Sequence, residues 1–228
     1  MVRRPCFEGG RKRGWIVAAM VVIGIKGGWG QVAEKDWRLL EEPSIQHHLA
    51  RLAYAVIVAT VCPNAKSFCS PTFYRLTLPK GVLASLSSLR AGCFVTIERG
   101  AKVRGCRGTL QPTQPNLVEE IVRAAMAACH DRRYPPITPA ELPHLSISIT
   151  VVKGLTPLDD IRTLRPDEGL VVRRGEKVGI VLPYEGKDPM VRLAWGKRKA
   201  GLQEDAPCAI WRLSCVRWKI KVGSLGSQ

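Results

Sequence analysis

The chain has 228 residues, and 35 lysines and arginines against 19 aspartates and glutamates give it a formal net charge of +16. Hydrophobic residues make up 46% of the sequence and charged residues 24%, a balance that excludes a mainly disordered, collagen-like or coiled-coil protein and a membrane protein of several spans. The length predicts one domain, or one domain built of two lobes.

The first 30 residues differ in composition from the rest. Six of them are basic and one is acidic, and an apolar run at residues 15–25 follows the basic stretch. This run is too short to cross a bilayer but has the length of the apolar part of a signal peptide. We therefore expect a leader that exports or anchors the protein. The alternative is a start codon set too far upstream of a cytoplasmic protein.

Cysteine and histidine spacing does not suggest a metal site. The sequence has eight cysteines, seven of them after residue 30, and no Cys-x-x-Cys pair. An odd number does not suit a complete disulfide framework. Because zinc ligands usually come in closely spaced pairs, we expect no metal.

Hydrophobic spacing in the first half of the chain predicts two helices and a hairpin. Asn116, with Glu119 three residues later, has the pattern of a capping box and opens the second helix. The predicted elements, in chain order, are a helix at 44–57, strands at 74–78, 93–97 and 102–110, and a helix at 116–128.

The second half adds a second hairpin and a final helix. The predicted elements are a helical turn from 138, strands at 145–151, 170–173 and 178–182, a helix from 188 to 201, and strand segments at 211–215 and 216–220. The alternation of apolar residues slips between Cys215 and Val216, as a β-bulge would cause. Helices and strands mix without a βαβ rhythm, so we expect an α+β fold.

The motif Arg-Gly-Cys-Arg-Gly carries the most chemical information in the sequence. Gly105 and Gly108 bracket Cys106, and glycine permits close approach of a ligand or tight packing. Arg104 and Arg107 would lower the pKa of the thiol and could bind a phosphate or carboxylate. The alternative is a β-bulge in a packed strand, with the cysteine as a small buried residue.

This motif also indicates a family. Residues 93–96, Cys-Phe-Val-Thr, and residues 103–110, Val-Arg-Gly-Cys-Arg-Gly-Thr-Leu, resemble the AMMECR-domain family, whose prokaryotic members are called AmmeMemoRadiSam system protein A. The family's Asp-x-Arg-Phe/Tyr-Pro-Pro loop matches residues 131–136, and its Lys-Ala-Gly-Leu motif matches residues 199–202. The resemblance covers residues 45–220.

The resemblance implies a fold and a domain division. The expected fold is a single two-lobed α+β domain with an antiparallel or mixed sheet and flanking helices, and with the motif near the groove between the lobes. The AMMECR-like domain would cover residues 44–221, with a leader at 1–30 and a flexible tail at 222–228. The family has no established reaction. Its prokaryotic members occur with Memo-like and radical-SAM proteins, which makes these the implied partners, and no cofactor follows from the residues.

Three departures from the family pattern stand out. Arg107 replaces an aliphatic residue and adds a charge beside the cysteine. The segment after Pro183 is short, and Gly196, Lys197 and Arg198 stand where the family often has histidine and cysteine. The last two departures put a contribution of the final helix to the site in doubt.

Three functions remain open. The first is a module that binds a small anionic ligand or a partner at the motif, which we prefer because the sequence does not clearly place a catalytic base. The second is a cysteine-dependent enzyme or enzyme subunit in a modification pathway, and the third is RNA or anionic-lipid binding by a basic surface that includes Arg173, Arg174, Arg192 and residues 197–199. The expected catalytic residues are Cys106, Asp131 and His130, and the expected ligand-binding residues are Arg104, Gly105, Arg107, Gly108, Thr109, Arg133 and Tyr134.

Overall fold

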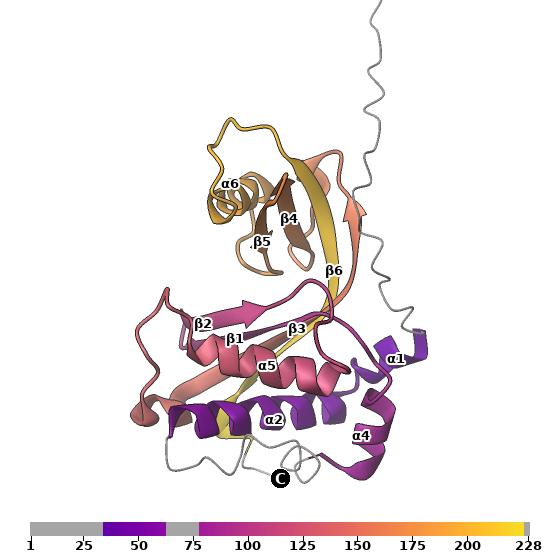
Figure 1. Ribbon diagram of the computed structural model, residues 1–228, viewed down its shortest axis with the longest axis vertical. Coiled ribbons are helices and arrows are strands. Elements are labelled where there is room, and N and C mark those ends of the chain that lie inside the picture. Colours follow the sequence, from indigo (N-terminus) through magenta and orange to yellow (C-terminus); the bar gives the residue numbers. More distant parts are fainter. Residues whose placement is uncertain (1–33, 63–77, 226–228) are drawn as a thin grey trace, which may run out of the picture.

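The computed structural model describes residues 34–62 and 78–225, which form two lobes connected by long strands (Figure 1). We call residues 34–62, 78–152 and 216–225 the large lobe, and residues 155–214 the small lobe. The expected leader lies outside the described residues, as does most of the strand expected at 74–78. In the described part of the chain, no helix is both long enough and apolar enough to cross a membrane.

One six-stranded sheet serves both lobes. Its strands are β1 (Cys93–Arg99), β2 (Lys102–Gly108), β3 (Leu145–Pro157), β4 (Gly169–Arg174), β5 (Lys177–Val181) and β6 (Ala209–Lys221). All neighbours are antiparallel, in the order β2-β1-β3-β6-β4-β5. The long strands β3 and β6 run through both lobes, and the sheet curls around the space between the lobes (Figure 1). The α+β fold and its two lobes are therefore confirmed, and the sheet is antiparallel rather than mixed.

Helices cover the outer face of this sheet. The helices are α1 (Glu34–Leu39), α2 (Pro43–Val61), α4 (Lys80–Leu86), α5 (Leu117–Cys129) and α6 (Pro189–Lys199), with 3-10 turns η2 (Pro139–His144), η3 (Ile161–Thr163) and η4 (Val222–Ser224). In the large lobe α2 and α5 pack beside the sheet, and in the small lobe α6 does (Figure 1). Asn116 caps α5 as predicted, because its side chain accepts the Glu119 N–H at 3.0 Å.

The domain extends beyond both predicted boundaries. Trp37 and Leu40, which precede residue 44, are buried in the core of the large lobe. At the other end, Val222 and Leu225 belong to the same core, so residues 222–225 are not the flexible tail that was expected. The helices α1 and α4 were not expected from the sequence, and both are seven residues or shorter. Such short helices carry too few turns to show a helical hydrophobic period.

The slip in the hydrophobic pattern near Cys215 has a different cause from the predicted one. β6 pairs without interruption, and the bulge lies in its partner β3, where Lys153 is the extra residue between Val152 and Gly154. In the small lobe the apolar residues of β6, such as Leu213, face the inside of the curled sheet. In the large lobe they face the helices instead, as Trp218 does. The pattern slips because the buried face of the strand changes between lobes.

Candidate functional site

A cavity of about 400 Å³ opens between the two lobes. Its walls come from the two edge strands of the sheet, β2 and β5, which the curl brings opposite each other. The lining residues are Phe94, Cys106, Arg107, Gly108 and Arg133 from the large lobe and Val178, Gly179, Ile180, Leu182, Glu185 and Lys199 from the small lobe. The expectation that the motif lies near the groove between the lobes is confirmed.

Cys106 is half-buried in this wall. It lies opposite Thr96 of β1, whose hydroxyl donates a hydrogen bond to the thiol sulfur at 3.1 Å. Burial raises the pKa of the thiol and outweighs the opposing effects of Thr96, Lys199 and Arg133. Arg133 lowers this pKa, but the net shift is upward, so the expectation that arginines near Cys106 favour the thiolate is wrong.

Asp131, in the loop after α5, holds the backbone N–H of Cys106. Its fully buried carboxylate accepts the Cys106 N–H at 3.0 Å and two guanidinium hydrogen bonds from Arg133, at 2.6 and 2.9 Å. Arg107 adds an ion pair at 3.3 Å. Burial alone would raise the pKa of Asp131, but the hydrogen bonds from Arg133 and Cys106, with the charge of Arg133, lower it to about 2. The carboxylate stays ionised and saturated with donors, so Asp131 is a positioning residue and not the proton carrier that we expected.

Arg133, in the same loop, binds the backbone carbonyl of Cys106. The Nη2 of Arg133, which binds Asp131, also donates a hydrogen bond to the carbonyl of Cys106 at 2.9 Å. Both backbone groups of Cys106 are therefore occupied by the loop that follows α5. Half of the Arg133 side chain and nearly half of the Arg107 side chain remain exposed, at 51% and 45%. The two guanidinium groups thus present a cationic surface to the cavity.

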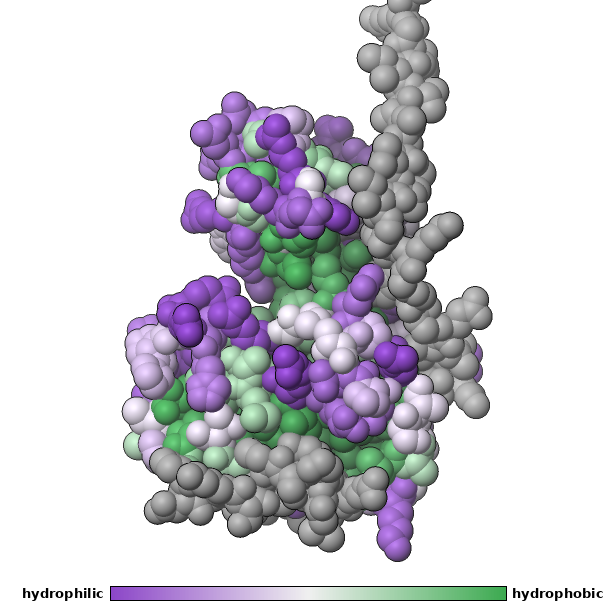
Figure 2. Space-filling view, in the orientation of Figure 1, coloured by the Kyte–Doolittle hydropathy of each residue, from purple (hydrophilic) through white to green (hydrophobic). Residues whose placement is uncertain are grey.

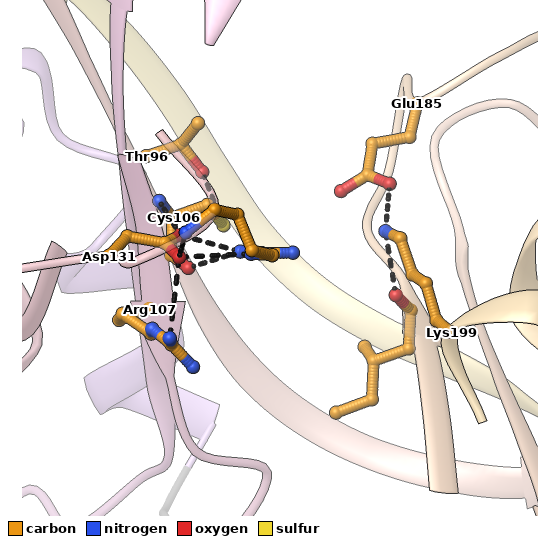
Figure 3. Close-up of polar contacts among 8 residues, drawn as sticks. Thr96, Cys106, Arg107, Asp131, Glu185 and Lys199 are labelled. Carbon is orange, nitrogen blue, oxygen red and sulfur yellow. Dashed lines mark hydrogen bonds and ion pairs between the residues drawn. The ribbon is translucent and has the colours of Figure 1, made fainter. Parts of the chain in front are cut away.

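The opposite wall carries a second ion pair. Lys199, at the end of α6, donates to the carbonyl of Ile180 at 2.9 Å and pairs with Glu185 (Figure 3). Glu185 follows Tyr184, the one non-glycine residue with positive φ in the described ranges. The sequence does not assign either residue to the site, because Glu185 lies in the short segment that departs from the family pattern and Lys199 directly follows the departing residues 196–198. The shared Lys-Ala-Gly-Leu motif was the available signal for Lys199.

Four of the seven expected ligand-binding residues do not line the cavity, and two of these, Arg104 and Thr109, bind carboxylates elsewhere in the large lobe. Arg104 is the extra residue of a bulge in β2, and its guanidinium binds Glu141 at 2.8 Å and the carbonyl of Pro136 at 3.2 Å. Thr109 donates to the buried Glu120 at 2.7 Å. Both residues stabilise loops of the large lobe, so their assignment as ligand contacts is corrected. The β-bulge that the alternative interpretation of the motif predicts is present, and it lies at Arg104.

His130 and Tyr134 also do not line the cavity. His130 is exposed at the end of α5, where its backbone N–H closes the helix. Tyr134 lies beside the loop arginine, with the guanidinium of Arg133 5.5 Å from its ring centre. Among the described residues, the His130 imidazole makes no hydrogen bond to Cys106. Arg192, assigned to a basic surface, is fully buried and donates to the carbonyl of Arg165 at 2.9 Å.

The two glycines of the motif are required by packing. A Cβ at Gly105 would lie 2.0 Å from the carbonyl oxygen of Ala128 in α5. A Cβ at Gly108 would lie 2.0 Å from the carbonyl oxygen of Cys93. Backbone atoms of a helix and of a neighbouring strand cannot move aside by the required distance. Gly108 lines the cavity in addition, whereas Gly105 faces the helix.

Comparisons with known proteins place this architecture in a family. The AMMECR1 family model matches residues 47–221. A protein of Thermotoga maritima is 38% identical over 146 residues, which cover 61% of this chain and 84% of the relative. Protein MK0488 of Methanopyrus kandleri is 34% identical over 179 residues, covering 71% and 79% respectively. The crystal structure of an uncharacterised protein, PH0010 from Pyrococcus horikoshii, shares the fold with a TM-score of 0.63 at 24% identity, covering 78% of this chain and 92% of that one. The chain belongs to the AMMECR1 family.

Proposed function

We propose that the cleft binds a small molecule with a carboxylate or phosphate group, and that the protein is a binding module. The observation that carries this proposal is the half-exposed pair Arg107 and Arg133, held in place by one buried carboxylate. Lys199 faces them from the other lobe (Figure 3). Nη1 of Arg133 and the Nε and Nη1 of Arg107 take no part in the contacts with Asp131 and Cys106, so these nitrogens can donate hydrogen bonds to a carboxylate or a phosphate. The aspartate holds the cations but is shielded from the cleft, so it does not compete for ligand.

The state of Cys106 argues against the alternative of a cysteine enzyme. A nucleophilic cysteine needs a lowered pKa or an adjacent base. Here burial raises the thiol pKa, and the side chain that hydrogen-bonds the sulfur is Thr96, a donor. Among the described residues, no imidazole or carboxylate hydrogen-bonds the thiol. We therefore assign Cys106 to the wall of the binding site.

The partners that the family resemblance implies could recognise the cleft with its ligand bound. The ligand would lie between two lobes, with its surroundings formed by both of them. A Memo-like or radical-SAM protein that contacts both lobes would then respond to whether the cleft is occupied. This association is part of the proposal and rests on the resemblance alone.

The test is a calorimetric titration with inorganic phosphate and with acetate. Arg133→Gln and Arg107→Gln should each weaken binding by about tenfold or more, since a hydrogen-bonded charge contributes roughly 1.5–3 kcal/mol. Arg162→Gln is the matched control, because Arg162 also pairs with an aspartate two residues earlier, at 3.0 Å, but does not line the cavity. Failure of both anions to bind at millimolar concentration, or equal losses in the control, would overturn the proposal.

A further inference from the structure

A second, smaller pocket adjoins the cationic cavity. It has a volume of about 130 Å³, and Val178 forms part of the wall of both spaces. Its lining residues are Leu110, Gln111, Leu155, Val171, Arg173, Val178 and Trp211. These residues come from both lobes, and Figure 2 shows hydrophobic surface gathered at the waist between them. The cationic cavity and this apolar pocket together form one groove along the inside of the curled sheet.

The apolar pocket is an exception in the described fold. On the outer face of the sheet, helices cover the apolar side chains of both lobes. On the inner face, Leu110, Leu155 and Trp211 remain only partly buried, and Val178 is 41% exposed. Leaving such side chains in contact with water costs free energy, so an apolar hollow of this kind commonly marks a binding site.

Arg173, the charged residue in the lining of this pocket, is bound to its own hairpin turn. Arg173 donates from its Nε to the carbonyl of Gly175 at 2.8 Å, within its own hairpin turn. It also lies 3.9 Å from Glu176. These contacts hold Arg173 at its own hairpin turn, and all the other lining residues except Gln111 are apolar, so the pocket favours an apolar occupant.

The size of the pocket identifies the kind of apolar group. A cavity of about 150 Å³ lined by leucine, isoleucine and phenylalanine side chains is enough to bind benzene. A pocket of about 130 Å³ that is open on one side fits a single aromatic ring or a short branched alkyl group. The indole of Trp211 in its wall offers an aromatic surface for an edge or an offset stack.

We propose that the ligand of the cleft is amphipathic, with its anionic group at Arg107 and Arg133 and a single ring in the pocket beside Trp211. This inference rests on the proposed function, since it assigns the other half of the same ligand. Phe94, Ile180 and Leu182 line the same cavity as the two arginines and Val178, so the cavity offers apolar surface beside its cations. An anion without a ring would fill only one end of the groove.

The experiment compares two anions of equal charge, methyl phosphate and phenyl phosphate, by calorimetry on the full chain. The same comparison with acetate and phenylacetate covers a carboxylate ligand. The ring compound should bind at least about tenfold tighter in one of the pairs, because burial of a phenyl group adds a favourable transfer free energy of this order. Binding of the ring should also change the tryptophan fluorescence, and Trp211→Phe should remove most of that change.

Two variants fill the pocket without touching the cationic end. Leu155→Trp and Leu110→Trp replace partly buried side chains of the lining. Each should abolish the advantage of the ring compound and leave methyl phosphate binding unchanged. Met126→Trp, at an exposed position of α5, is the matched control and should keep the advantage.

The outcomes separate this inference from the proposed function. If methyl phosphate or acetate binds and Arg133→Gln weakens it, but neither ring compound binds tighter, the cleft is an anion site and the inference is refuted. An advantage of the ring that survives both pocket-filling variants would place the ring elsewhere and would also refute it. If no anion binds, the proposed function itself fails.

Discussion

Replacing Asp131 with asparagine would test how the cationic wall of the cleft is held. The substitution keeps the shape of the side chain but removes its charge and turns one acceptor into a donor. In the native protein this carboxylate accepts hydrogen bonds from the Cys106 N–H and from Arg133, and it pairs with Arg107. The asparagine would leave two guanidinium groups without an anion between them, so both folding stability and anion binding should fall.

The size of the stability loss follows from the pKa. The partners of Asp131 lower its pKa from 3.8 to about 2, and a change of this size corresponds to about 2.5 kcal/mol. Both arginines remain half exposed, so solvent screening reduces this figure. We expect Asp131→Asn to lower the free energy of unfolding by about 1–2 kcal/mol at pH 7.

The pH dependence distinguishes this mechanism from a general loss of packing. A lowered pKa in the folded state gives stability that is present above the unfolded pKa of about 3.9 and lost as the pH falls toward 2. Urea unfolding should therefore show a constant gap between Asp131→Asn and wild type from pH 7 to pH 5, which closes toward pH 2. Asp160→Asn, which breaks the exposed pair with Arg162, should change little at any pH. A gap that persists undiminished at pH 2 would refute the electrostatic argument.

Two further predictions concern the motif itself. Cys106 should react slowly with iodoacetamide at pH 7 in the folded protein and at an ordinary thiol rate in urea, because burial raises its pKa; peptide mass spectrometry that finds rapid, selective labelling in the native state would contradict this. Gly105→Ala should destabilise the protein by at least about 1–3 kcal/mol in urea unfolding, since its Cβ would collide with the carbonyl of Ala128. Gly81→Ala, whose Cβ meets nothing within 4 Å, is the control and should be neutral or slightly stabilising.

Much of the fold could be predicted because local patterns and packing agree. The capping box at Asn116 and the strict alternation in β3 each specify an element through neighbours in sequence. The hairpin of β4 and β5 was predicted in the same way, from the glycine between two apolar runs; Gly175 has a φ of +60°, which favours glycine. Where a strand serves two lobes, as β6 does, the pattern reports which face is buried at each end. The slip in alternation at Cys215 therefore marks a change of buried face and not a bulge in β6.

The site was predicted in part, for a similar reason. Cys106, Arg107 and Arg133 could be assigned because they belong to the motif or to the loop that resembles the family pattern. The opposite wall could not be assigned, because the contact of Lys199 and Glu185 with the cavity depends on the curl of the whole sheet. Roles were harder to predict than positions. Whether an arginine lowers a thiol pKa or instead binds a carboxylate behind it depends on burial and geometry, which spacing does not contain.

The charged residues of the cleft also solve a structural problem of an open sheet. A curled sheet that does not close leaves two edge strands, whose free backbone groups invite pairing with another chain. Here Asp131 and Arg133 occupy both backbone groups of Cys106 on β2, and Lys199 occupies the carbonyl of Ile180 on β5. Two of these residues, Arg133 and Lys199, also contribute positive charge to the cleft. The arrangement of charge around Cys106 therefore has a structural cause that does not require a reactive thiol, and it supports the proposal of an anion-binding cleft.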